Sequence, residues 1–176
     1  MPIADPESVA RMICLRQLTL APRTRAQLAD KLHERGVPAD IGERVLDRLT
    51  EVGLVDDAAY ADAWVRSRHS GRGLARRALA YELRDRGVAA ETAAEAVERL
   101  GDDEELETAR ALVARRLPGT RGLAPEARAR RLAGLLARKG YPAGLVWRVV
   151  REALAAQGDE VASACDPGDG DPPPPS

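Results

Sequence analysis

The sequence is short of residue types on which large classes of protein depend. Its 176 residues include no phenylalanine, no asparagine, two cysteines and two histidines, and aromatic residues make up only 3%. Cys14 and Cys165 are far apart, so we expect no disulfide framework. No stretch approaches the ~18 apolar residues that cross a bilayer, and the N-terminus lacks the pattern of a signal peptide. We therefore expect a soluble cytoplasmic protein.

Arginine supplies almost all of the positive charge. Lys31 and Lys139 are the only lysines among 27 basic residues, a skew that also fits a general bias in nucleotide composition. The formal net charge is −1, but residues 158–176 contain five acidic residues and no basic one. Residues 1–157 therefore hold 27 basic residues against 23 acidic ones, a net charge of +4, which suits an anionic partner.

The spacing of apolar residues is helical along nearly the whole chain, and no period-two run of β-branched residues occurs. The fold class is therefore predicted to be all-α. Thr24 and Gln27 have the spacing of a capping box, and Gly36 and Gly53 suit helix ends. We expect helices over residues 6–20, 24–35, 38–52, 57–69, 73–86, 89–100, 103–116, 125–139 and 142–156.

One pattern occurs three times. Leucines lie eight and four residues before Gly36, Gly87 and Gly140, and a basic residue directly precedes each glycine. The spacings of 51 and 53 residues predict three tandem three-helix repeats in an elongated, curved array, because small units contact only their neighbours. The acidic, proline-rich C-terminal tail is predicted to be disordered. The expected boundaries are 1–52, 53–101 and 102–157 for the repeats and 158–176 for the tail.

Residues that could carry catalysis are not arranged for it. Gly71-Arg72-Gly73 lacks both the preceding strand and the third glycine of a dinucleotide-binding loop. His33 and His69 have no partner at metal-ligand spacing, so we expect both on solvated helix surfaces. Acidic pairs lie at expected helix starts, where capping is favoured over paired catalytic carboxylates: Asp56-Asp57, Asp102-Asp103 and Glu104-Glu105. We predict no enzyme activity, no metal and no cofactor.

Basic residues gather in the second and third repeats. On the helix expected over 73–86, Arg77, Tyr81 and Arg84 share a face that is distinct from the stripe of Leu79 and Leu83. Such a surface indicates an anionic partner, either phosphate or an acidic protein groove, although part of it also fits a solvated face. The candidate contact residues are Arg66, Arg68, Arg72, Arg76, Arg77, Tyr81, Arg84, Arg128, Arg131, Arg138 and Lys139.

Tyr60 and Trp64 are one helical turn apart. Their spacing beside Ala61 and Val65 favours packing in the core, while the scarcity of aromatic residues leaves a functional role open.

Two classes of function fit a basic helical repeat. Residues 28–37 superficially resemble the helix and turn of a DNA-binding helix-turn-helix motif. The helix that would follow opens with Asp40 and Glu43, and its counterpart in the second repeat opens with Glu91, so these acidic residues would repel phosphate. We therefore favour a module that lies along a complementary groove of a partner, with direct binding to duplex DNA as the alternative.

The middle of the chain resembles the central signature of the RecX family. The matching residues are Gly53-Leu-Val-Asp56-Asp57-Ala-Ala-Tyr60, Trp64-Val-Arg66-Ser67-Arg68, Gly73, Leu79, Glu82-Leu83 and Arg86-Gly87-Val88. Weaker similarity extends over residues 11–155, and Leu74 stands where many family members have proline.

The resemblance implies a non-enzymatic modulator of the RecA recombinase. Such a protein lies in the helical groove of the filament that RecA forms with single-stranded DNA and ATP, and it inhibits RecA ATPase, strand exchange and the SOS co-protease activity. It thereby regulates DNA repair and recombination. We expect a monomer without membrane contact, and weak direct contact with DNA stays an open alternative.

Overall fold

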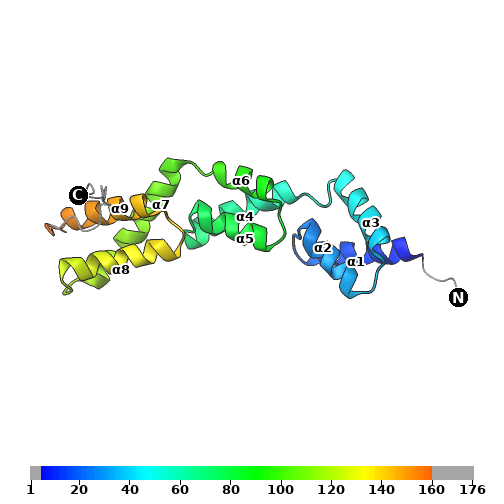
Figure 1. Ribbon diagram of the computed structural model, residues 1–176, viewed down its shortest axis with the longest axis horizontal. Coiled ribbons are helices and arrows are strands. Elements are labelled where there is room, and N and C mark those ends of the chain that lie inside the picture. Colours follow the sequence, from blue (N-terminus) through cyan, green and yellow to red (C-terminus); the bar gives the residue numbers. More distant parts are fainter. Residues whose placement is uncertain (1–4, 160–176) are drawn as a thin grey trace, which may run out of the picture. The chain divides into compact units, whose positions relative to one another are not determined.

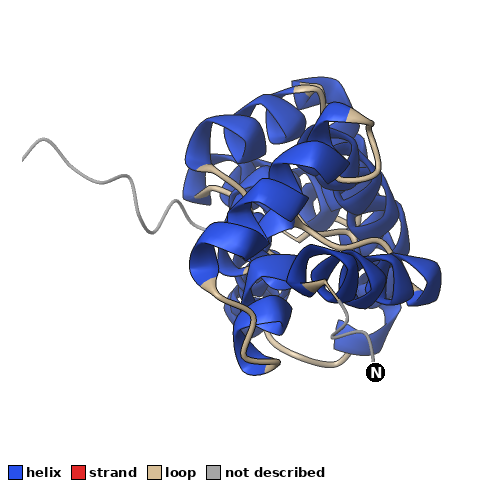
Figure 2. Cartoon of the chain, turned by 90° about the vertical axis from the view of Figure 1, so that its right-hand side faces the viewer, coloured by secondary structure: helices blue, strands red, loops and turns tan. Residues whose placement is uncertain are grey.

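The computed structural model describes residues 5–159, and over that range it is built from helices with no strand (Figure 2). This confirms the predicted all-α class. The elements labelled in Figure 1, together with one short 3-10 turn, are α1 (Pro6–Leu20), α2 (Arg25–Glu34), α3 (Ala39–Glu51), α4 (Asp57–Arg72), α5 (Arg76–Asp85), α6 (Ala90–Glu98), α7 (Asp102–Arg116), η1 (Leu117–Thr120), α8 (Pro125–Arg138) and α9 (Ala143–Ala155).

The helices form three successive three-helix domains, α1–α3, α4–α6 and α7–α9, as the repeat predicted. The described chain divides into two compact units. The first unit runs to Glu105 and also includes Lys139–Tyr141, and the second comprises Leu106–Arg138 and the residues from Pro142 onward. As far as the structure describes them, from Asp5 onward, the first and second domains therefore lie within the first unit.

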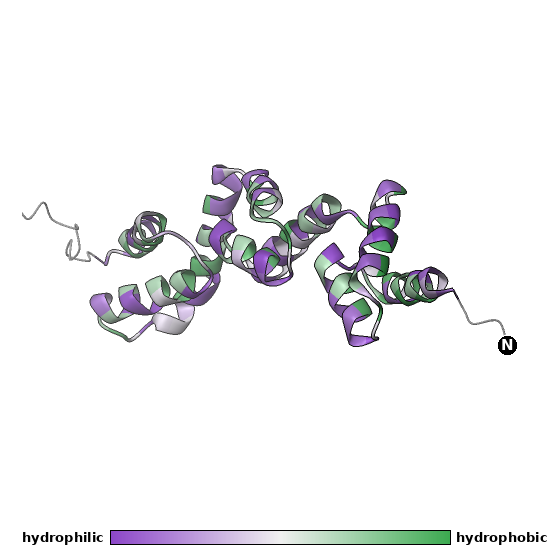
Figure 3. Ribbon diagram, turned by 45° about the vertical axis from the view of Figure 1, so that its right-hand side comes forward, coloured by the Kyte–Doolittle hydropathy of each residue, from purple (hydrophilic) through white to green (hydrophobic). Residues whose placement is uncertain are grey.

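The repeated leucines build the cores. Most helices have a hydrophobic and a hydrophilic face (Figure 3). Leu28 and Leu32 of α2 pack with α1 and α3, and Leu79 and Leu83 of α5 pack with α4 and α6. Their counterparts in α8 are also fully buried, and all six leucines are at most 2% exposed. Burial of one such side chain contributes about 1.5–3 kcal/mol, so each of these positions contributes substantially to the stability of its domain.

The helix ends at Thr24 and Asp56 have the expected capping contacts, and the largest shift from the expected boundaries is at the junction of α4 and α5. Thr24 and Gln27 form both halves of the capping box, and the Asp56 side chain accepts a hydrogen bond from the Ala59 amide at 2.9 Å. The helix expected to end at residue 69 instead continues to Arg72, where Gly73 ends it in the left-handed conformation with φ 64°. The next helix consequently starts at Arg76 rather than at residue 73.

The longer α4 overturns the prediction for one histidine. His33 is exposed as expected, but His69 is 5% exposed, with its Nδ1 atom 2.8 Å from the carbonyl oxygen of Leu74. The Leu74 carbonyl that contacts the imidazole lies just past Gly73, which ends α4, and Leu74 is itself buried.

The predicted tail lies outside the described residues except for Gly158 and Asp159. These two residues follow α9 closely, because the Asp159 amide donates to the carbonyl of Leu154 at 3.1 Å. The Asp159 carboxylate pairs with Arg128 of α8.

The N-terminus of α2 is satisfied by residues of the second domain. The Arg25 amide donates to a carboxylate oxygen of Asp57 at 2.9 Å, and the Thr24 hydroxyl donates to the carbonyl of Arg86 at 2.7 Å. The following residue, Gly87, lies against Ala26. The first turn of a helix has amides without intrahelical acceptors, so these contacts both cap α2 and join two domains.

The N-terminus of α5 is satisfied in a parallel way inside the first unit. The Arg76 amide donates to a carboxylate oxygen of Glu105 at 2.9 Å, and the Ala75 amide donates to the carbonyl of Lys139 at 2.9 Å. Gly140 then lies against Ala78. In the second and third copies of the repeat, the basic residue and the glycine thus supply a carbonyl acceptor and a close backbone approach.

Candidate partner-binding surface

The outward face of α5 carries an arginine–tyrosine–arginine row. Leu79 and Leu83 are fully buried, and this orientation turns Arg77, Tyr81 and Arg84 toward solvent. Tyr81 is 66% exposed, which is high for an aromatic side chain. Within residues 5–159 the guanidinium groups of Arg77 and Arg84 make no hydrogen bond or ion pair, so both remain available to a partner.

A second cluster forms around Trp64 on α4. Its ring stacks on Tyr60 with centroids 5.9 Å apart and planes inclined by 13°. The guanidinium carbons of Arg68 and Arg86 lie 4.2 and 3.8 Å from the Trp64 ring centroid, within the range of cation–π attraction. The indole N–H donates to Glu82 at 2.9 Å.

This cluster bears on two sequence interpretations. Tyr60 and Trp64 are partly buried and pack against the core of the second domain, so the expected packing is confirmed. Arg86 was not among the candidate contact residues, although its place before Gly87 in the repeat singled it out. Arg86 and Trp64 are far apart in the sequence, so the sequence did not indicate the contact that the fold creates between them.

Several predicted contact residues have structural partners. The Arg76 guanidinium donates to Glu105 and pairs with Asp102, and the Lys139 ammonium donates to the carbonyl of Arg72 at 2.6 Å. Arg72 itself lies 3.7 Å from Glu82. Arg66, on the exposed side of α4, makes no ion pair among the described residues.

Arg128 corrects the expectation of an outward basic face on α8. Its side chain is 8% exposed and donates to the Thr120 hydroxyl at 3.0 Å and to Gln157 at 2.6 Å, and it also pairs with Asp159. A buried guanidinium needs such partners to offset desolvation, so Arg128 holds the third domain together. Arg131 and Arg138 of the same helix are exposed and unpaired within the described range.

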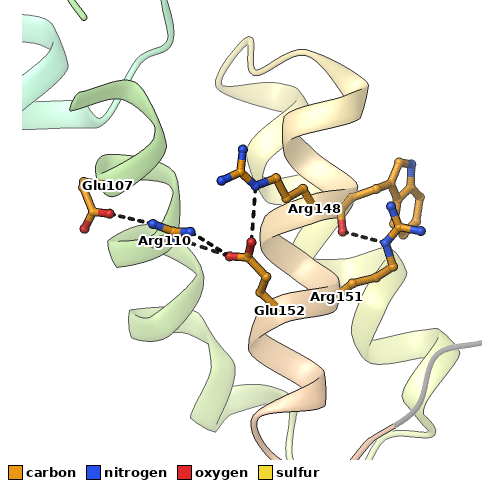
Figure 4. Close-up of polar contacts among 6 residues, drawn as sticks. Glu107, Arg110, Arg148, Arg151 and Glu152 are labelled. Carbon is orange, nitrogen blue, oxygen red and sulfur yellow. Dashed lines mark hydrogen bonds and ion pairs between the residues drawn. The ribbon is translucent and has the colours of Figure 1, made fainter. Parts of the chain in front are cut away.

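Other arginines of the third domain are neutralised by acids. Figure 4 shows Arg110 of α7 and Arg148 of α9 converging on Glu152, with hydrogen bonds of 3.1 and 3.3 Å. Hydrogen bonding from Arg110 holds the pKa of the Glu152 carboxyl below its ordinary value. Arg151 donates to the carbonyl of Trp147 at 3.3 Å (Figure 4). Arg110 and Arg148 therefore have acidic partners within the third domain, whereas Arg151 has a backbone carbonyl as its partner.

The described residues contain no group of three or more His, Cys, Asp or Glu side chains that could hold a metal. None of the helices between residues 5 and 159 combines the length and the apolar character needed to cross a membrane. The geometry instead defines a protein of tandem three-helix domains that presents arginine and aromatic side chains on its surface.

Comparison with known proteins gives the family. Domain models of RecX match in chain order, with the first three-helix domain at residues 10–49, the second at 56–97 and the third at 102–150. Regulatory protein RecX of Thermobifida fusca is 60% identical over 161 residues, covering 90% of this chain and 87% of the relative. That of Streptomyces lividans is 56% identical over 167 residues, covering 95% and 89%. The chain belongs to the RecX family of regulatory proteins, which supports a regulatory role.

Solved structures share the fold. The crystal structure of RecX from Lactobacillus salivarius superposes with a TM-score of 0.80 at 20% identity, covering 85% of this chain and 97% of that one. A second crystal structure, of a regulatory protein RecX, gives a TM-score of 0.75 at 23% identity and covers 85% and 73%.

Proposed function

We propose that this protein binds the filament of RecA on single-stranded DNA and inhibits RecA ATPase, strand exchange and SOS co-protease activity. Membership of the RecX family supports this proposal. The structural observation that carries it is the outward row Arg77–Tyr81–Arg84, whose two cations have no partner within the described chain. In this proposal the protein acts as a cytoplasmic monomer and without catalysis of its own.

The chemistry of the row suits an acidic groove or a phosphate backbone. Two guanidinium groups one turn on either side of Tyr81 offer planar hydrogen-bond donors, and the tyrosine adds a rigid apolar surface. Each exposed charge contact contributes little by itself, so affinity depends on several domains binding together. Binding should therefore weaken as salt is raised.

The contact residues that were predicted from the sequence have different roles in this proposal. Arg66 of the first unit and, separately, Arg131 and Arg138 of the second unit are further contact residues in this proposal, because each is exposed and unpaired within residues 5–159. Arg68 and Arg72 lie beside Trp64 and Glu82 and form a second contact area. Arg76, Lys139 and Arg128 are assigned to holding the fold.

Charge reversal tests the row. In the variant Arg77→Glu/Arg84→Glu, we expect the concentration for half-inhibition of RecA ATPase to rise about tenfold or more, because two attractive contacts become repulsive. The measurement is titration of purified protein into a RecA–single-stranded-DNA ATPase assay, with filament binding followed in parallel. Thermal unfolding should be unchanged, because exposed substitutions of this kind alter stability by about 0.5 kcal/mol or less.

The matched control is Arg11→Glu/Arg48→Glu, which changes the same charge at exposed, unpaired arginines of the first domain. If both double variants inhibited like the parent protein, the row would not be the contact site. If the parent left RecA turnover unchanged while binding duplex DNA with sequence preference, the helix-turn-helix alternative would replace the proposal.

A further inference from the structure

A pocket of about 350 Å³ opens between the first and second domains, inside the first compact unit. Its volume falls within the range of ligand pockets, about 300–1,000 Å³. The lining residues are Ala21, Pro22, Arg23, Gln27, Tyr60, Ala63, Trp64, Ser67 and Arg86. None of these residues is an acid, and the two arginines come from different domains, Arg23 from the first and Arg86 from the second.

Arg23 brings a buried donor to the pocket. Its Nε atom is buried and makes no hydrogen bond within the described part of the chain. No acid between residues 5 and 159 forms an ion pair with its guanidinium. A buried N–H group without an acceptor is unfavourable, and more so when the group is charged. An anion from outside the chain would supply the acceptor and balance the charge.

Arg86 adds a second cation whose donors are also unused. Its guanidinium carbon lies over the Trp64 ring, 3.8 Å from the centroid. This contact holds the guanidinium in place but uses none of its N–H groups, which make no hydrogen bond to the described residues. The neighbouring acid, Glu82, accepts from the Trp64 indole at 2.9 Å and lies 3.7 Å from Arg72. The charge of Arg86 is therefore fixed in position and has no acidic partner there.

The neutral polar residues of the pocket are donors as well. The Gln27 side-chain oxygen accepts from the Thr24 amide at 3.2 Å, so its NH₂ group is the part left for a ligand. The Ser67 hydroxyl adds a further donor. A phosphomonoester carries a charge of about −1.5 to −2 at pH 7 and three strong acceptor oxygens. The two arginines and these donors match such a group better than a carboxylate or a phosphodiester, which each carry one charge.

We propose that this pocket binds a phosphate dianion, that Arg23 and Arg86 are its cationic ligands, and that the bound phosphate ties the first domain to the second. The two domains already meet beside these arginines. The Thr24 hydroxyl donates to the carbonyl of Arg86 at 2.7 Å, and Gly87 lies against Ala26. A phosphate held by both arginines bridges the same junction. This site is separate from the row Arg77–Tyr81–Arg84 and goes beyond the proposed function.

The probes are ribose 5-phosphate and inorganic phosphate, each titrated by calorimetry into the full chain at constant ionic strength. We expect submillimolar binding of ribose 5-phosphate and none of ribose, which lacks the phosphate. The pocket is larger than a phosphate, and Ala21, Pro22 and Ala63 offer an apolar surface to an attached group. Tighter binding of ribose 5-phosphate than of inorganic phosphate would assign the site to phosphomonoesters, whereas equal binding would assign it to the free ion. Failure of both to bind at millimolar concentration would overturn the proposal.

Substitution of the two arginines locates the site. Arg23→Gln and Arg86→Gln should each weaken binding about tenfold, a loss of about 1.4 kcal/mol. Arg23→Lys keeps the charge but lacks the Nε–H donor, so it should also weaken binding several-fold. The matched control, Arg11→Gln/Arg48→Gln, should leave the affinity unchanged. Without ligand, Arg23→Gln should unfold at no lower temperature than the parent, since the donor that it removes has no acceptor. Parent affinity in Arg23→Gln or in Arg23→Lys would contradict the assignment.

Hydrogen exchange tests the tie between the domains. The Arg25 amide of the first domain donates to Asp57 of the second at 2.9 Å, so its exchange reports on this junction. Saturating ribose 5-phosphate should slow this exchange several-fold in the parent and leave Arg23→Gln unchanged. Binding without such protection would remove the tie from the proposal.

An oligothymidylate without terminal phosphates separates the dianion from a nucleic-acid backbone. It should bind more weakly than ribose 5-phosphate. Tighter binding with the same dependence on Arg23 and Arg86 would overturn the phosphate dianion and assign the pocket to nucleic acid. None of these measurements involves RecA, so they succeed or fail independently of the proposed function.

Discussion

The N-termini of α2 and α5 are capped by the same two kinds of acceptor, a carboxylate and a backbone carbonyl, but the group that donates to the carbonyl and the burial of the carboxylate differ. In each, a carboxylate from a later helix accepts the first amide, and the carbonyl before a repeat glycine accepts a second donor. At α2 that second donor is the Thr24 hydroxyl, whereas at α5 it is the backbone amide of Ala75. The carboxylate at α2, Asp57, is half-buried, whereas Glu105 at α5 is 3% exposed.

The difference shows that corresponding helices of two repeats can be capped by residues of the same helix or by residues that are distant in the sequence. Thr24 is stabilised by Gln27 of its own helix, so α2 keeps part of its cap without the second domain. Ala75 has no side chain for capping, so α5 depends on Glu105 and Lys139. We therefore expect the α5 end to be the more sensitive of the two to substitution.

The largest effect should come from the glycines at these contacts. A Cβ atom at Gly140 would lie 2.7 Å from the Ala78 Cβ and 2.8 Å from its backbone nitrogen, and one at Gly87 would overlap the Cβ of Ala26. Gly140→Ala and Gly87→Ala should each lower the free energy of unfolding by about 3 kcal/mol, which combines left-handed strain with overpacking. Urea unfolding followed by circular dichroism measures this.

Gly36→Ala is the control for the glycine pair. Gly36 has the same left-handed conformation, φ 73°, but nothing lies within 4 Å of an added Cβ. Its substitution should cost about 1 kcal/mol from backbone strain alone. Equal losses at all three glycines would mean that the close approach of the domains contributes nothing.

A smaller effect should separate the two capping acids. Glu105→Ala removes the acceptor of the Arg76 amide and of its guanidinium, and we expect a loss of about 2–3 kcal/mol. Asp57→Ala should cost about 1 kcal/mol, because the Arg25 guanidinium keeps its pairs with Glu43 and Asp47. If urea unfolding showed a larger loss of stability for Asp57→Ala than for Glu105→Ala, burial of the capping carboxylate would not explain which helix N-terminus is the more sensitive.

The capping comparison also shows what the sequence could predict. The box at Thr24 and Gln27, the leucine stripes and the outward row on α5 follow from spacing within one or two turns, and the structure confirms these placements. Glu105 was interpreted only as part of the start of its own helix. Its contact with Arg76 crosses 29 residues, and no local pattern indicates it.

The same reason explains the wrong placement of Arg128. It looked like a surface residue because its acceptors Gln157 and Asp159 lie 29 and 31 residues away. His69 was misplaced for a more local reason, because the carbonyl oxygen that its imidazole contacts belongs to Leu74, just past the Gly73 turn that ends α4. Helical periodicity indicates neither a partner in a distant element nor a contact made across a turn.

The smallest effect concerns Tyr141, whose hydroxyl donates to the carbonyl of Gly73 at 2.9 Å. Tyr141→Phe removes this hydrogen bond, and near pH 8 we expect a loss of about 1 kcal/mol in the free energy of unfolding. The exposed Tyr81 provides a control, since Tyr81→Phe should leave stability unchanged at that pH.

The sign of this effect should change in alkaline solution. Burial, with a further contribution from the charge of Glu105, raises the pKa of Tyr141 well above its ordinary value. The unfolded chain therefore loses the Tyr141 proton from about pH 10 upward while the folded protein retains it, and the parent loses about 1.4 kcal/mol of stability per pH unit there. Tyr141→Phe lacks this loss, so the two stabilities should converge between about pH 10 and 11 and then cross. A constant difference from pH 8 to pH 11 would contradict a buried, protonated Tyr141 at the α5 end.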